Sequence, residues 1–112
     1  YLGDTYLGDI STVSNNANII CRDFEAIDGD RVSILVNDIV VVKNLTLDSS
    51  FRGINLKLED GFNKIDFIAL NQGTSGPNTA ELRIYDDNEK LISSNQWNLS
   101  TGSKATLIIV KK

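Results

Sequence analysis

The chain has 112 residues, with 11 basic and 15 acidic side chains, a formal net charge of -4 and no histidine. This length is that of one domain, which can bury a modest core without disulfides or a structural metal. The acidic balance argues against a nucleic-acid partner, whose binding surface is normally basic, and against binding to an anionic membrane. No apolar run is long enough to cross a bilayer, so no membrane span is expected.

Residues 1–16 are interpreted as an extended N-terminal arm that precedes a domain at residues 17–112. The opening Tyr1-Leu2-Gly3-Asp4 is repeated almost letter for letter as Tyr6-Leu7-Gly8-Asp9. Two copies are too few for a repeat fold, which needs stacked units to bury a core. The arm is polar and rich in small residues, so it is either a flexible tail or an extended segment that docks on a partner.

After the arm, apolar and polar residues alternate in short runs between turn residues, and no segment has a helical period of useful length. The predicted strands are residues 17–23, 31–37, 39–42, 51–59, 62–70, 79–85, 90–93 with 96–99, and 104–111. Asn37-Asp38 is a tight hairpin signal between two of them. About eight strands at this spacing predict an all-β fold, namely an antiparallel two-sheet β-sandwich of the immunoglobulin-like or jelly-roll-like kind.

The run 62–70 differs from the others because it is apolar on both faces near its end. Ile65, Phe67 and Ala69 share one face, while Ile68 and Leu70 make the other face apolar as well. Such a strand is usually central in a sheet or partly covered by a neighbouring segment. The following linker, 71–78, contains the only proline of the chain, so it is a loop, either a plain crossover or a binding loop.

The absence of histidine argues against an enzyme, because it removes the commonest general base, the usual triad relay and the commonest metal ligand. Paired carboxylates could serve glycoside hydrolysis, but most acidic residues lie in turns, where turn chemistry accounts for them. Cys21 is the only cysteine and lies in a strand-like run, which indicates a small buried hydrophobe. The sequence therefore predicts a protein that is not an enzyme.

Four acidic residues that are close in sequence are candidate calcium ligands: Asp23, Glu25, Asp28 and Asp30. Hard oxygen ligands from one loop suit Ca²⁺, although their spacing does not fit an EF-hand. The alternative is a solvated acidic turn. No other cofactor is expected, and a chain with one cysteine and no histidine is unsuited to zinc.

Carbohydrate binding is a second candidate, centred on Trp97 and Tyr85 with the amides of the 71–78 loop, Asn71, Gln72 and Asn78. An indole can offer a sugar a flat apolar platform while nearby amides bond to its hydroxyl groups. Trp97 has polar neighbours on both sides, which favours exposure. The alternative is that Trp97 packs into the core, as such a large side chain usually does.

Self-association is the third candidate, because the arm lacks proline and could pair along an open sheet edge of a neighbouring copy. Tyr1, Leu2, Tyr6 and Leu7 would then be its anchors. The alternative is a disordered tail, since an arm of this composition buries little surface without a partner.

Four segments carry a resemblance to a known group: DGDRVSILVND (28–38), GFNKI (61–65), ALNQG (69–73) and PNTA (77–80). They combine a strand ending in an asparagine-containing turn, a Gly-hydrophobe-Asn strand entry and a loop closing on Pro-Asn-Thr-Ala. The domain thereby resembles small secreted β-sandwich modules of Bacteroidota and associated marine sequences. The resemblance implies the fold and an extracellular or cell-surface setting, and it implies no activity.

The leading hypothesis is a non-catalytic extracellular structural or adhesive module that self-assembles through its arm, as a filament, surface-layer or virion-type subunit does. Its partners would be other copies of itself or a larger extracellular assembly. The alternative is a carbohydrate-binding module with an exposed aromatic face. An arm ordered against another copy, together with a buried Trp97, would favour the first, and exposure of Trp97 and Tyr85 on one face beside the 71–78 loop would favour the second.

Overall fold

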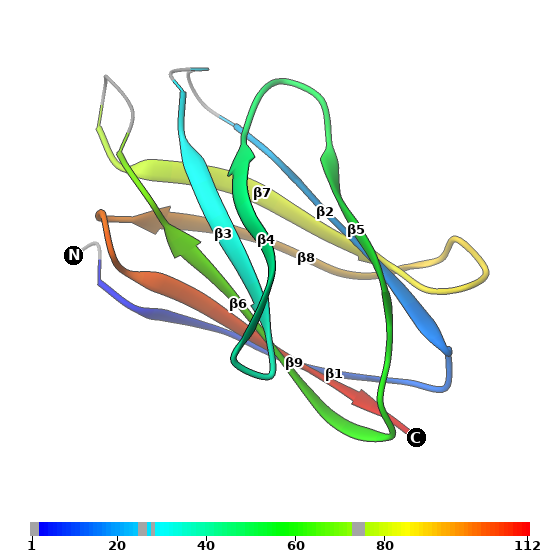
Figure 1. Ribbon diagram of the computed structural model, residues 1–112. Helices are drawn as coiled ribbons and strands as arrows, with labels where there is room; N and C mark the ends of the chain where they lie inside the picture. Colours follow the sequence, from blue (N-terminus) through cyan, green and yellow to red (C-terminus); the bar gives the residue numbers. More distant parts are fainter. Residues whose placement is uncertain (1–2, 25–26, 28, 73–75) are drawn as a thin grey trace.

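The computed structural model describes residues 3–24, 27, 29–72 and 76–112 of the chain. This part contains nine β-strands and no helix (Figure 1). The strands are β1 (Thr5–Thr12), β2 (Asn16–Arg22), β3 (Arg31–Val36), β4 (Ile39–Thr46), β5 (Arg52–Lys57), β6 (Gly61–Ala69), β7 (Asn78–Tyr85), β8 (Leu91–Leu99) and β9 (Lys104–Lys111). The predicted all-β fold is confirmed, and the strand beyond the expected eight is β1.

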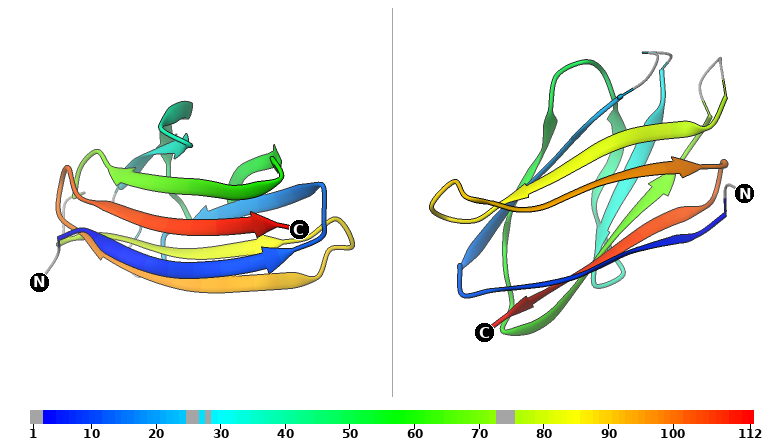
Figure 2. Two further views of the ribbon diagram at one scale, coloured as in Figure 1. Left: turned by 90° about the horizontal axis from the view of Figure 1, so that it is seen from below. Right: turned by 180° about the vertical axis from the view of Figure 1, so that it is seen from behind.

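The strands form two sheets that pack face to face as a β-sandwich (Figure 2). The first sheet has the order β1-β9-β6-β3-β4, and the second has the order β5-β2-β7-β8. Every pairing is antiparallel except that of β1 with β9, which is parallel. The first sheet therefore ends at β4 and β1, and the second ends at β5 and β8.

Strand β6 is the middle strand of the first sheet, with β9 on one side and β3 on the other. Ile65, Phe67 and Ala69 point into the sandwich and are buried, whereas Ile68 lies on the outward face and is partly exposed. This confirms the interpretation of residues 62–70 as a central strand. Neighbours on both sides cover part of the outward face, so an apolar residue is tolerated there.

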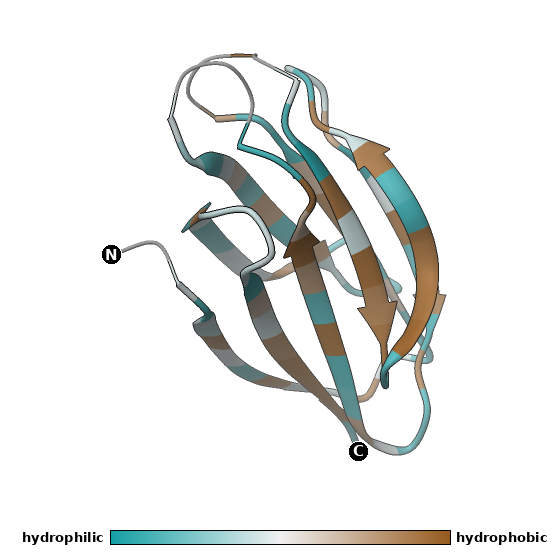
Figure 3. Cartoon of the chain, turned by 60° about the vertical axis from the view of Figure 1, so that its left-hand side comes forward, coloured by the Kyte–Doolittle hydropathy of each residue, from teal (hydrophilic) through white to brown (hydrophobic). Residues whose placement is uncertain are grey.

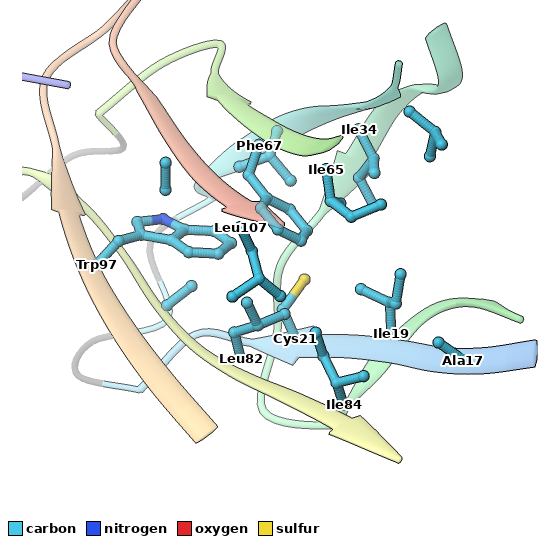
Figure 4. Close-up of a cluster of buried hydrophobic side chains, with 14 of the residues drawn as sticks. Ala17, Ile19, Cys21, Ile34, Ile65, Phe67, Leu82, Ile84, Trp97 and Leu107 are labelled. Carbon is cyan, nitrogen blue, oxygen red and sulfur yellow. The ribbon is translucent and has the colours of Figure 1, made fainter. Parts of the chain in front are cut away.

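The core lies between the two sheets and consists of inward-facing residues, which alternate with outward-facing residues along the strands (Figure 4). Ile19, Cys21, Leu82 and Ile84 come from the second sheet, and they face Ile34, Ile65, Phe67 and Leu107 of the first. The alternation of buried and half-buried positions is regular along β2 and β3, and along β7 from Ala80 to Tyr85. The period-two pattern of the sequence is thus the pattern of burial.

Residues 5–12 do not form a separate arm, because β1 pairs within its own chain, from Thr5 opposite Ala105 to Thr12 opposite Lys111. A bulge lies between Tyr6 and Gly8, and Gly8 has a φ of 111°, which favours glycine. Leu7 and Ile10 both pack against the core. The bulge breaks the alternation of the sequence, and for this reason the segment did not look like a strand.

The predicted hairpin at Asn37-Asp38 places β4 at the edge of the first sheet. Both turn residues have positive φ, 50° and 69°, as a two-residue turn with Asn and Asp requires. The Asn37 Oδ1 accepts the Lys64 N–H at 2.9 Å, and the Lys64 ammonium lies 2.7 Å from the Asp38 carboxylate. These contacts fix the turn against β6, so β4 begins at a defined position.

Burial of Cys21 predicts a dependence of stability on pH. Desolvation raises the pKa of its thiol from 9.0 to about 12. The unfolded thiol ionises above pH 9 while the folded thiol keeps its proton, so the unfolded state binds fewer protons and stability falls between pH 9 and 12. The slope from this group is at most about 1.4 kcal/mol per pH unit.

The measurement is the free energy of unfolding in urea across that interval for the natural chain and for Cys21→Ala. The variant is less stable at neutral pH, because it leaves a small cavity, and the difference shrinks as the pH rises. A difference in stability between the two proteins that stays constant from pH 9 to 12 would contradict this account.

Candidate functional site

Trp97 is buried in the core, so of the two alternatives for this residue the packed position is correct and the exposed aromatic platform of the carbohydrate hypothesis is wrong. Its side chain is 1 % exposed, and its ring centroid lies 4.9 Å from that of Phe67 (Figure 4). The indole N–H donates to the Oδ1 of Asn78 at 3.1 Å. The polar neighbours that suggested exposure, Gln96 and Asn98, point to the opposite face of β8, as the period of a strand requires.

The three amide residues of the 71–78 loop hold the fold together. Asn78 is fully buried, and its amide donates to the carbonyl groups of Arg31 and Asn71 at 3.0 and 2.9 Å. Asn71 accepts the Arg31 N–H at 2.8 Å and donates to the Gly29 carbonyl at 3.0 Å. The Gln72 side chain accepts bonds from the N–H and hydroxyl of Thr101. These amides make hydrogen bonds within the protein, and a ligand-binding role for them stays a prediction.

Tyr85 lies at the opposite end of β7 from Asn78. Eight residues of strand span about 24 Å, so Tyr85 and the loop cannot bind one small ligand together. Tyr85 is partly exposed on the outward face of the second sheet, where it lines a cleft with residues of β2 and β5. The structure therefore separates the residues that the carbohydrate hypothesis grouped.

Two of the four candidate calcium ligands, Asp23 and Asp30, bond to the same residue, Thr79. Asp23 and Asp30 are both buried, and Thr79 donates its hydroxyl to Asp23 at 3.3 Å and its N–H to Asp30 at 3.0 Å. Glu25 and Asp28 lie outside the described residues. Within the described ranges, no three acidic or cysteine side chains come close enough together to hold a metal ion. Calcium binding here stays a prediction.

Of the four proposed anchors of the arm, Tyr6 and Leu7 fall in the described part of the chain and Tyr1 and Leu2 do not. Tyr6 is exposed on β1, and its hydroxyl donates to the Asp9 carboxylate at 3.1 Å. Leu7 packs against the core. Tyr6 is therefore available for a contact between copies, whereas Leu7 already serves the fold.

The edge strand β4 carries an exposed apolar run that was not singled out as a site. Ile39 is 68 % exposed, Val40 54 % and Val41 44 %, and Figure 3 shows the run as an uninterrupted hydrophobic stretch on an outer strand. Register shifts in its pairing with β3 let three successive side chains reach solvent. The signal was visible in the sequence, since residues 39–42 are apolar without alternation.

An apolar edge strand of this kind offers main-chain and side-chain contacts to another strand. Among the described strands, the other end of the same sheet is β1, which carries Asp9 on its outward side, whereas β4 carries Lys43. The two edges are therefore opposite in charge. Their arrangement can support contact between copies.

Comparison with known proteins gives no further information: no family model, no curated protein and no solved structure matches this chain. The described residues include no helix that is long and apolar enough to pass through a membrane.

The role of Asn78 predicts a large loss of stability for Asn78→Ala. The change leaves the Trp97 N–H and the Arg31 and Asn71 carbonyl groups without their amide partner inside the fold, so the free energy of unfolding falls by about 2 kcal/mol or more. Asn98→Ala is the matched control, because Asn98 is exposed on β8, and it changes stability by less than about 0.5 kcal/mol. Urea unfolding followed by Trp97 fluorescence measures both, and equal losses would exclude a structural role for the Asn78 amide.

Proposed function

We propose that this protein is a non-catalytic structural or adhesive module that assembles by strand addition, with β4 of one copy pairing along β1 of the next. The observation that supports the proposal most is the exposed run Ile39-Val40-Val41 on an edge strand. Natural proteins usually protect such an edge with charge, proline or a covering segment. The extracellular setting is part of the proposal and rests on the sequence resemblance alone.

Charge and topology favour β1 of a second copy as the strand that covers β4. Lys43 on β4 and Asp9 on β1 attract each other across such a contact, whereas two β4 strands would bring two Lys43 side chains into one short ladder. Pairing of the two different edges of one sheet is heterologous, so it leaves a free edge at each end. Repetition of the contact then builds an open filament.

The strength of one contact can be bounded. Full burial of a valine or isoleucine contributes roughly 1.5–3 kcal/mol. The three side chains are about half covered in the single copy, so burial of their exposed halves on association contributes about 3 kcal/mol in total. Association costs about 4 kcal/mol or more in lost freedom, which the ladder hydrogen bonds offset only in part. A single contact is therefore weak, and assembly requires high local concentration or several contacts at once.

The first test of the proposed assembly concerns the apolar run. Val41→Lys places a charge on the edge of β4 and abolishes the concentration-dependent association of the natural chain, measured by sedimentation velocity. Leu91→Lys is the matched control, because Leu91 is 46 % exposed, close to the 44 % of Val41, but lies on β8 of the other sheet. The control associates like the natural chain. A natural chain that is monomeric at its highest soluble concentration would contradict the proposal.

The second prediction tests whether β1 is the partner strand. Lys43→Asp and Asp9→Lys each weaken association about two- to fivefold, because each replaces an attractive pair by a repulsive one. The double variant restores association, since every contact again joins opposite charges. If β4 pairs with β4 instead, Asp9→Lys has no effect and the double variant behaves like Lys43→Asp. The melting temperature of each variant confirms that the fold is retained.

A further inference from the structure

A cleft of about 460 Å³ lies on the outward face of the second sheet, which is the face turned away from the first sheet. Its floor comes from β2, β5 and β7, and its end wall is the turn between β7 and β8, which projects beyond the sheet in Figure 2. Small-molecule sites in proteins have volumes in this range. No step of the proposed assembly uses this surface.

The floor of the cleft contains a row of polar side chains that the strand register brings together. Asn55 of β5 lies opposite Asn18 of β2, and Asn18 lies opposite Tyr85 of β7. Neighbouring strands are about 4.8 Å apart, so the row spans about 10 Å. Asn16 is two residues before Asn18 on the same face and adds a third amide about 7 Å along the strand.

These three amides differ from the asparagines that build the fold. The side chains of Asn63, Asn71 and Asn78 are each held by two or more hydrogen bonds to the protein. Within the described residues, no hydrogen bond engages the amide groups of Asn16, Asn18 or Asn55. Asparagine is also unfavourable in strands, so three on one face are not explained by strand propensity. Their donors and acceptors are available to a ligand.

The end wall is held in place by its own hydrogen bonds. Asp86 Oδ1 accepts the N–H groups of Asn88 and Lys90 at 2.8 and 2.9 Å. Asp87 Oδ2 accepts the Asn15 N–H at 2.8 Å, which ties the turn to the start of β2. The pairing of β7 with β8 shifts register between Ile84 and Tyr85, where the turn begins. The carboxylates of Asp86 and Asp87 therefore have fixed positions before any ligand arrives.

We propose that this cleft binds a neutral saccharide. Among the described residues that line it, none is lysine or arginine and three are carboxylates, so the lining itself disfavours an anionic ligand. Sugar hydroxyl groups both donate and accept hydrogen bonds, as the amides of Asn16, Asn18 and Asn55 do. The Tyr85 ring supplies the apolar surface on which a sugar ring packs. The carboxylates of the turn accept further hydroxyl groups.

The test is a titration of the ¹⁵N-labelled chain with five neutral probes: cellohexaose, laminarihexaose, xylohexaose, mannohexaose and maltohexaose. At least one probe shifts the side-chain amide signals of Asn16, Asn18 and Asn55 and leaves the buried amides of Asn63 and Asn78 unchanged. Tyr85→Ala weakens that binding about tenfold, and Tyr85→Phe weakens it less, because the ring provides most of the contact. Asn98→Ala, an exposed amide on the same sheet, binds like the natural chain.

Two comparisons decide the ligand class and separate this site from the assembly. Spermine and polygalacturonate serve as the cationic and anionic probes, and larger shifts of the same three amides with either one overturn the proposal. So does a lack of shifts with all five neutral probes. The assembly-deficient Val41→Lys variant binds the neutral probe with unchanged affinity, since Val41 and the cleft are on different sheets. The two proposals therefore succeed or fail independently.

Discussion

A buried hydrogen-bond cluster around Asn78 is the constraint on which the arrangement of the two sheets depends. Its amide joins β7 of the second sheet to the Arg31 carbonyl of the first and receives the indole N–H of Trp97. Trp97 in turn packs on Phe67 of the first sheet. Buried polar groups are costly unless each is paired, so this cluster admits one relative position of the sheets. Trp97 and Asn78 are thereby committed to the fold.

With its tryptophan in the core, the molecule presents different chemistry on its two sheets. The first sheet exposes apolar side chains at the β4 edge and Phe62 on its central strand. The second sheet exposes one large apolar side chain among its described strands, Leu91 of β8, and the cleft on its outward face presents amides, carboxylates and Tyr85. Antiparallel sandwiches usually have polar outward faces on both sheets, so the asymmetry is itself informative. It is expected if one sheet contacts protein and the other contacts a hydrated ligand.

The sequence predicted most strands and the central position of β6, because period-two alternation reports burial directly. It missed β1, because the bulge at Gly8 interrupts the alternation. It left Trp97 open between an exposed and a buried position, because residues at i±1 lie on the opposite face of a strand and say nothing about that side chain. The cleft could not be predicted from the sequence, because Asn18, Asn55 and Tyr85 come together only through the pairing of three strands. The order of those strands is a property of the tertiary structure.

The two proposals together constrain the shape of an assembly. Each copy adds the five strands of the first sheet, so the repeat distance between successive copies along the growing sheet is about 24 Å. Neighbouring strands twist by about 20–25°, which amounts to roughly 100–125° per copy. Continuous pairing of β4 with β1 therefore favours a twisted filament over a flat layer. In such a filament the saccharide clefts point outward in about three directions, and their avidity for an extended glycan exceeds that of one copy.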